Sequence, residues 1–121
     1  MSFWDIFKKR EVRQSEDSFI VTITDASVKV EHPEWPVREV FWNDIHEIKL
    51  INTDEGPWLP DIWMALIDDN KKVCLIPHGN KGFDQVFEII SKYEGFNMEN
   101  FGKSMTYSDN AEFVLWVKKQ G

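Results

Sequence analysis

Two apolar segments near the middle of the chain constrain the fold more than any other part of the sequence. Residues 61–67 and 71–76 have the composition of β-strands, and Asp68-Asp69-Asn70 between them favours a tight turn, so together they predict a hairpin. The first strand carries apolar residues on both faces, Ile62, Met64 and Leu66 alternating with Trp63, Ala65 and Ile67. We therefore expect the hairpin to be central in a sheet, or to be covered on its second side by a helix.

Four further strands are predicted before this hairpin. β-Branched residues dominate residues 19–24 and 28–31, and alternating patterns over residues 37–42 and 45–51 predict a third and a fourth strand. Between the second and third, His32-Pro33-Glu34-Trp35-Pro36 is predicted to be a loop, because each proline removes a donor from a strand ladder.

The last third of the chain predicts helices and a final strand. Apolar residues of segment 82–93 recur at helical spacing, namely Phe83, Val86, Phe87 and Ile90, and Gly95 is expected to cap the end of this helix. Residues 97–105 predict a second, short helix with Asn97 as N-cap, and residues 111–117 predict a strand. This order predicts an α+β fold: a curved antiparallel sheet of about six to seven strands with one main helix near the C-terminus.

The chain length of 121 residues fits one domain, which we expect to span residues 19–121. Residues 1–18 are expected to form a short helix and a linker, with Phe3, Trp4 and Phe7 at helical spacing ahead of a basic cluster. Aromatic residues beside basic ones resemble a membrane-surface anchor, but one or two turns bury too little for stable membrane association.

Charge and cysteine content limit the classes of partner. The 14 basic and 21 acidic residues give a net charge of −7, which disfavours nucleic acids and anionic membranes and favours a basic protein or a cation. The single cysteine, Cys74, excludes an internal disulfide, and no secretory signal or transmembrane segment is predicted, so we expect a cytoplasmic protein.

An acidic loop carries the main functional hypothesis. The segment Thr53-Asp54-Glu55-Gly56-Pro57-Trp58-Leu59-Pro60-Asp61 places a tryptophan among carboxylates between two predicted strands. We expect Trp58 to anchor a basic partner, Asp54, Glu55 and Asp61 to pair with its Lys or Arg residues, and Asp68 and Asp69 to steer its approach. The alternatives are a solvated acidic face, and loop tryptophans (Trp35 and Trp58) that fold back over an open end of the sheet.

The sequence supports a catalytic site, a metal site or an anion site less well than a partner-binding loop. The loop carboxylates lack a nucleophile or oxyanion motif, so no catalytic residue and no enzyme activity are predicted. The nearest metal-like cluster, Cys74, His78 and Asp84, has too few ligands for zinc, and neither a metal nor a cofactor is expected. The loop from Pro77 to Gly82 precedes a helix and would suit an anion, but its glycines also fit a tight strand-to-helix turn. Cys74 and three strand tryptophans are expected in the core: Trp42, Trp63 and Trp116.

Two resemblances add expectations. Phe41-Trp42-Asn43-Asp44-Ile45-His46-Glu47-Ile48, after two opening strands, is similar to a segment of bacterial pleckstrin-homology-like domains, which implies a bent antiparallel sheet closed by a helix over residues 19–93. The chain departs from that family by its added helix and strand, and its first hairpin offers only Lys29 where phosphoinositide-binding members are basic.

The second resemblance is to small uncharacterised bacterial proteins. It rests on five short segments: Thr53-Asp54-Glu55-Gly56-Pro57, Asp61 with Trp63, Pro77 with Gly79, Gly95-Phe96-Asn97, and Ser108 with Asn110-Ala111, Phe113 and Trp116. Small acidic proteins of this kind resemble the immunity proteins of bacterial toxin systems. The sequence thus predicts a non-enzymatic binding protein, most concretely an immunity-type inhibitor of a basic protein. The alternatives are a homo-oligomeric module that uses a sheet edge with Phe3, Trp4 and Phe7, and a domain binding a small ligand or anion.

Overall fold

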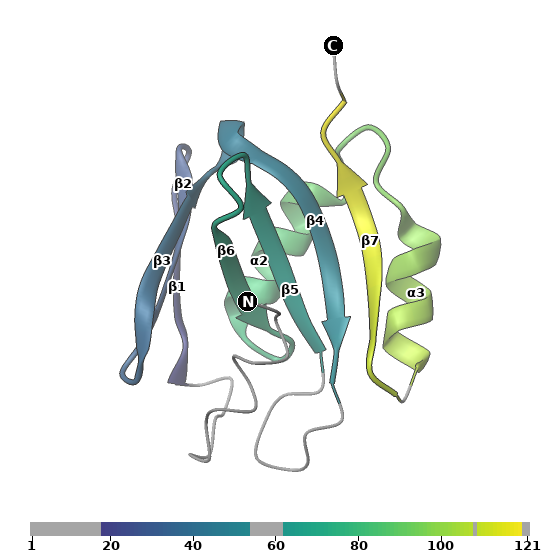
Figure 1. The fold of residues 1–121 in the computed structure, drawn as a ribbon, viewed down its shortest axis with the longest axis horizontal. Coiled ribbons are helices and arrows are strands. Elements are labelled where there is room, and N and C mark those ends of the chain that lie inside the picture. The colour runs from purple at the N-terminus through teal and green to yellow at the C-terminus, as the bar shows by residue number, and fades with distance from the viewer. Residues whose placement is uncertain (1–17, 54–61, 108, 120–121) are drawn as a thin grey trace.

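The computed structural model describes residues 18–53, 62–107 and 109–119, which form an α+β domain (Figure 1). In chain order its elements are β1 (Ile20–Ile23), β2 (Ser27–His32), β3 (Trp35–Phe41), the 3-10 helix η2 (Trp42–Asp44), β4 (Ile45–Asn52), β5 (Ile62–Asp68), β6 (Val73–Pro77), α2 (Lys81–Ile90), α3 (Met98–Thr106) and β7 (Ala111–Val117). The predicted N-terminal helix and linker lie outside the described residues.

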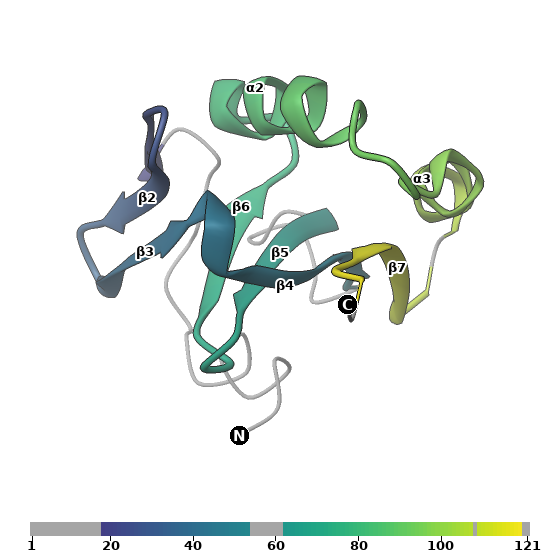
Figure 2. The same cartoon turned by 90° about the horizontal axis from the view of Figure 1, so that it is seen from above.

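The described strands pair antiparallel in two sheets. One sheet has the order β1-β2-β3, and the other has the order β6-β5-β4-β7. The turn of η2 between β3 and β4 carries the chain from the first sheet to the second, so the single curved sheet that was expected is divided at residues 42–44. Figure 2 shows α2 and α3 on the same side of the four-stranded sheet.

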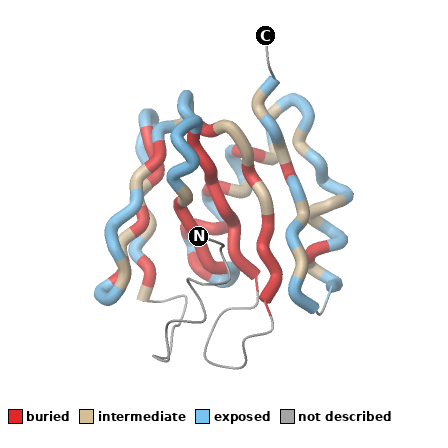
Figure 3. Tube along the Cα trace, in the orientation of Figure 1, coloured by how far each residue is buried: buried red, intermediate tan, exposed pale blue. Residues whose placement is uncertain are grey.

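The expected central hairpin is confirmed in β5 and β6. β5 lies between β4 and β6, and all seven of its residues are buried, including both alternating apolar sets (Figure 3). In β6 the residues from Cys74 to Pro77 are buried as well, although this strand ends the sheet. The core of the described domain therefore centres on β5 and its two neighbours.

The start of β3 and the end of α2 differ from the sequence prediction. β3 begins at Trp35, so the loop after His32 consists of Pro33 and Glu34 alone. Pro36 fits because β3 is the end strand of its sheet, where a missing amide need not break a ladder. Helix α2 ends at Ile90, where the amides of Lys92 and Tyr93 bond three residues back and tighten the chain, and Gly95, with φ +88°, lies in the turns that follow.

The three tryptophans assigned to strands have different environments. Trp63 in β5 is fully buried, as expected for a core residue. Trp42 lies in η2 and not in a strand; it is half-buried and donates its Nε1–H to the carbonyl of Thr24 at 2.8 Å. Trp116 in β7 is also half-buried, with its Nε1–H donated to the carbonyl of Glu94 at 3.0 Å.

The start of α2 is packed directly on β1, and Gly82 makes this contact possible. A Cβ atom at Gly82 would overlap the Cβ and both γ-methyl groups of Val21. Asn80 ties the same two elements together, because its Nδ2–H donates to the carbonyl of Phe19 at 2.8 Å while its Oδ1 accepts from the amide of Gly82 at 2.7 Å. Glycine is therefore required at position 82, because the backbone there lies too close to Val21 of β1 to leave room for a side chain.

We predict that Gly82→Ala lowers the free energy of unfolding by about 1–3 kcal/mol, because the added methyl group has to displace Val21. The matched control is Gly102→Ala in α3, where a Cβ would meet nothing within 4 Å and alanine should add about 0.5–1 kcal/mol. Urea denaturation of both variants measures the difference. Equal stability of the two variants would show that the contact with Val21 relaxes at no cost.

Candidate partner-binding surface

The six residues predicted to bind a partner attach to opposite ends of β5. Asp54, Glu55, Trp58 and Asp61 fall outside the described residues, but the two strand ends that hold them are described: Asn52 of β4 pairs with Ile62 of β5, and both are buried. Asp68 is the last residue of β5 at the other end, and Asp69 follows it. The six residue steps of this strand separate the two ends by about 20 Å.

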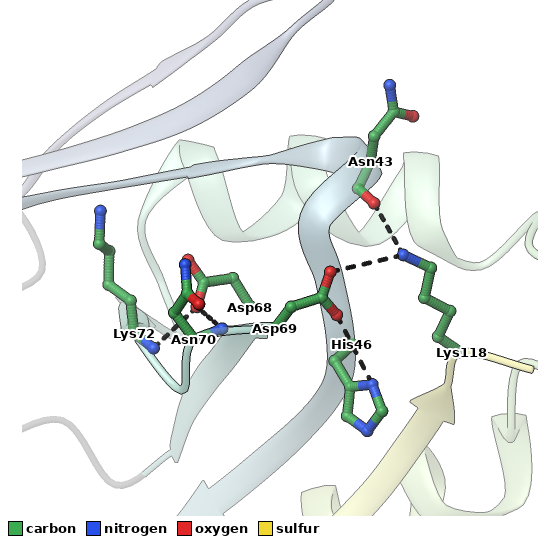
Figure 4. A network of polar contacts seen from close by, with 7 residues as sticks. All are labelled: Asn43, His46, Asp68, Asp69, Asn70, Lys72 and Lys118. Atoms are coloured by element: carbon green, nitrogen blue, oxygen red, sulfur yellow. Dashed lines mark hydrogen bonds and ion pairs between the residues drawn. The ribbon is translucent and has the colours of Figure 1, made fainter. Parts of the chain in front are cut away.

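Asp68 has a structural role in its turn. Its side chain is buried, and Oδ1 accepts hydrogen bonds from the amides of Asn70 at 2.9 Å and Lys72 at 2.8 Å (Figure 4). The amide of Lys71 bonds the carbonyl of Asp68 at 2.9 Å, and Lys71 adopts a left-handed conformation with φ +66°. The carboxylate of Asp68 thus holds the β5–β6 turn, and little of it faces a partner.

Asp69 is exposed and belongs to a cluster of mixed charge. Its Oδ2 lies 3.8 Å from Nζ of Lys118, and its Oδ1 lies 3.8 Å from Nδ1 of His46 (Figure 4). Lys118 also donates from Nζ to the carbonyl of Asn43 at 2.9 Å. Such exposed contacts contribute little to stability. They do bring a cation beside Asp69, and Lys71 and Lys72 follow it in the chain, so this end of the sheet is less acidic than Asp68 and Asp69 alone would suggest.

At the end of β5 that holds the acidic loop, aromatic rings gather around Trp63. Trp35 is half-buried and stacks on Trp63 with ring centroids 5.5 Å apart, and Phe19 meets both tryptophans edge-on at 5.2 and 5.3 Å. The ring of His32 lies 4.5 Å from that of Phe19. Trp35 therefore lies against its own domain, in agreement with the alternative in which the loop tryptophans fold back over the sheet. The sequence pattern had not marked Phe19 or His32 as part of such a cluster, because they are brought to Trp63 from a different sheet.

The loop before α2 uses its own residues to satisfy the helix start. The carbonyl of Asn80 accepts from the amide of Phe83 at 3.0 Å, in addition to the side-chain bond to Gly82. Two of the amides that an anion would need at this helix start, those of Gly82 and Phe83, already have acceptors, and Gly82 is buried. Gly79 has φ +98°, so a glycine is favoured there by the turn itself.

Cys74 is buried on β6, as expected for a core residue. Burial raises the pKa of its thiol to about 12, with a smaller opposing effect of Arg38, so the reactive thiolate is disfavoured in the folded protein. Among the described residues there is no group of three or more His, Cys, Asp or Glu side chains that could hold a metal ion.

We predict that Asp68→Ala lowers the free energy of unfolding by about 1–3 kcal/mol, because it leaves two turn amides without their acceptor. The neighbouring variant Asp69→Ala should change it by less than about 1 kcal/mol, since only exposed ion pairs are lost. Thermal and urea unfolding of the two variants measures both values. A larger loss for Asp69→Ala than for Asp68→Ala would contradict these roles.

The chain was compared with protein-family models, with curated proteins and with solved structures. None of the helices in the described ranges is long and apolar enough to cross a membrane. No protein-family model, curated protein or solved structure in these comparisons matched the chain.

Proposed function

We propose that this protein is a non-enzymatic binding protein that recognises a basic protein partner through the loop of residues 54–61. The observation that carries the proposal is the attachment of this acidic, tryptophan-bearing loop to the buried, paired ends of β4 and β5. An immunity-type inhibitor of a bacterial toxin is the most concrete form of this function, by analogy with small acidic proteins of that kind.

The attachment of the loop supports this proposal in physical terms. Asn52 and Ile62 sit in the best-packed part of the described domain, so the two ends of the loop are held by a rigid scaffold. Loops on rigid scaffolds commonly carry binding residues, and a tryptophan that enters a partner's pocket can contribute about 2 kcal/mol or more. The three carboxylates Asp54, Glu55 and Asp61 suit Lys and Arg on the partner, and the net charge of −7 favours a basic protein.

The two acidic residues of the β5–β6 turn have unequal parts in this proposal. The buried carboxylate of Asp68 acts through its turn, while Asp69 is exposed and available for steering. The turn follows the far end of β5, about 20 Å from Ile62, whereas charges are screened over about 8 Å at physiological ionic strength. Asp69 should therefore affect the association rate weakly, and contacts at the loop should dominate affinity.

For the fold, we propose that the two sheets and α2 form a pleckstrin-homology-like half-barrel to which α3 and β7 are added. The division of the sheet at η2, in the segment that resembles that family, supports this assignment. The pairing of β7 with β4 is an extension that such a half-barrel does not need.

We predict that Trp58→Ala lowers affinity for the partner by roughly 30-fold, the equivalent of about 2 kcal/mol, without unfolding the domain. Tagged protein is first used to retain partners from its native cell extract at low and at high salt, and the affinity of the retained protein is then measured by calorimetry.

Charge-neutral substitution of the three loop carboxylates (Asp54→Asn, Glu55→Gln and Asp61→Asn) should weaken binding at low salt and remove much of its salt dependence.

The matched control for these loop variants is Asp69→Asn, which removes one carboxylate at the opposite end of β5 and should change affinity less than about threefold. Unchanged affinity of a folded Trp58→Ala variant would exclude Trp58 as the anchor. A stronger effect of Asp69→Asn than of the loop substitutions would move the binding surface to the β5–β6 turn.

A homo-oligomeric module is the second candidate, and exposed apolar side chains on the three-stranded sheet favour it. Ile20, Val37 and Phe41 are 61, 55 and 48% exposed. The pairing register and the alternation along β3 place them on one outer face, together with the charged residues Lys29, Glu31 and Glu39. Apolar residues gathered on a free sheet face are typical of surfaces that associate.

If this face mediates assembly, Phe41→Asp should convert a dimer to a monomer in light scattering, because a buried carboxylate without a partner is strongly unfavourable. Gln85→Asp on the exposed side of α2 serves as the control and should leave the mass unchanged. A wild-type protein that stays monomeric at high concentration would rule out self-association through this face.

A further inference from the structure

The C-terminal elements α3 and β7 contain few buried residues. Leu115 alone is buried among the seven residues of β7, and Ser104 alone among the nine of α3. All seven residues of β5 are buried by contrast (Figure 3). β7 also ends its sheet and contacts the other strands only through β4. Segments with few buried apolar contacts open at lower free energy than the core does.

Several contacts hold α3 and β7 to each other. The amide of Asn97 donates to the carbonyl of Leu115 at 2.7 Å, and Nδ2 of Asn100 donates to the carbonyl of Val114 at 2.7 Å. The rings of Tyr107 and Phe113 meet edge-on with centroids 5.7 Å apart. These contacts join β7 to α3, which lies beside it (Figure 1), so we expect the strand to leave the sheet together with its helix.

Besides the ladder between β7 and β4, Trp116 donates its Nε1–H to the carbonyl of Glu94 at 3.0 Å, and Nζ of Lys49 lies 2.7 Å from Oε1 of Glu112. The ring of Phe101 in α3 also stacks on that of Phe87 in α2, with centroids 4.3 Å apart.

Two further polar contacts tie this pair of elements to the rest of the domain, one at each end of β7. Asn52, at the end of β4, is 2% exposed; its Nδ2 donates to the carbonyls of Ser104 at 2.9 Å and Tyr107 at 3.1 Å, and its Oδ1 accepts from the hydroxyl of Ser104. At the other end, Lys118 reaches Asn43 and Asp69 at the surface (Figure 4). The buried contact is the stronger of the two, because breaking it leaves buried polar groups unpaired.

We propose that residues 97–107 and 109–118 form a flap that opens from β4 as one unit while the rest of the domain stays folded, and that the contacts of Asn52 set how often it opens. The open state leaves one edge of β4 without its partner strand. It keeps the β5–β6 hairpin, the three-stranded sheet and α2 in place, since β7 joins the domain at the end of a sheet.

Hydrogen exchange read by mass spectrometry or NMR tests the flap. The amides of α3 and β7 should exchange at similar protection, at least about tenfold below that of β5, and with a weaker dependence on low urea because less surface is exposed. Equal protection of β7 and β5 would show one cooperative unit and overturn the proposal. Clearly different protection in α3 and β7 would show that they do not open together.

Two substitutions separate flap opening from global unfolding. Val28→Ala, in the core of the three-stranded sheet, destabilises the closed and the open-flap states equally. It should therefore accelerate exchange in β5 and alkylation of buried Cys74 by roughly tenfold or more while leaving α3 and β7 unchanged. Acceleration of α3 and β7 by the same factor would overturn the proposal.

Asn52→Ala destabilises the closed state alone, so it should accelerate exchange in α3 and β7 by about tenfold or more. Ser104→Ala keeps both carbonyl acceptors and should give a smaller effect of the same kind if the first variant does not fold. Lys118→Met is the control for the surface contact and should change exchange less than about threefold. Unchanged exchange of the flap in folded Asn52→Ala would exclude the assigned role of Asn52.

Discussion

The burial of β5 on both faces is the constraint on which the rest of the described structure depends. A strand with seven buried residues needs a neighbour on each edge and a covering layer on each face. β4 and β6 supply the edges, and α2 lies across one face of the sheet (Figure 2). The start of α2 in turn lies close against β1, which is possible because Gly82 has no side chain. This contact holds the three-stranded sheet against the rest of the core.

The elements that could be predicted from the sequence are those whose pattern is local. The apolar run from Ile62 to Ile67 and the turn at residues 68–70 predicted the β5–β6 hairpin, and the helical spacing from Phe83 to Ile90 predicted α2. Asn97 as N-cap predicted α3. The division into two sheets was not predicted, because it depends on three residues of 3-10 helix at Trp42–Asp44, within what looked like the end of one strand. Trp35 was assigned to a loop because of the prolines beside it, whereas its stacking on Trp63 depends on a contact between sheets that no local pattern reports.

The candidate binding surface was predictable to a smaller extent, for an electrostatic reason. A window of sequence counts charges without their partners, and Asp68 and Asp69 entered the predicted site as two similar carboxylates. In the structure one of them accepts two amides of its own turn, and the other lies near a lysine from the far end of the chain. The four remaining residues of the predicted site fall outside the described residues, so their contribution rests on composition and on the rigid strand ends that hold them.

β4 deviates from regular pairing on both of its edges. Its register with β5 shifts between Ile45 and Glu47, and its register with β7 shifts one step later, between Ile48 and Lys49. Bulges bend a strand and increase its twist. The first irregularity has its extra residue, His46, on β4 close to the turn between the sheets, and the second has its extra residue, Leu115, on β7. The two parts of β4, near His46 and beyond Leu50, would respond differently to the gain or loss of a residue during evolution. A residue gained or lost near His46 can be absorbed by an existing irregularity. The same change beyond Leu50 would exchange the two faces of the last part of β4, where both faces are buried.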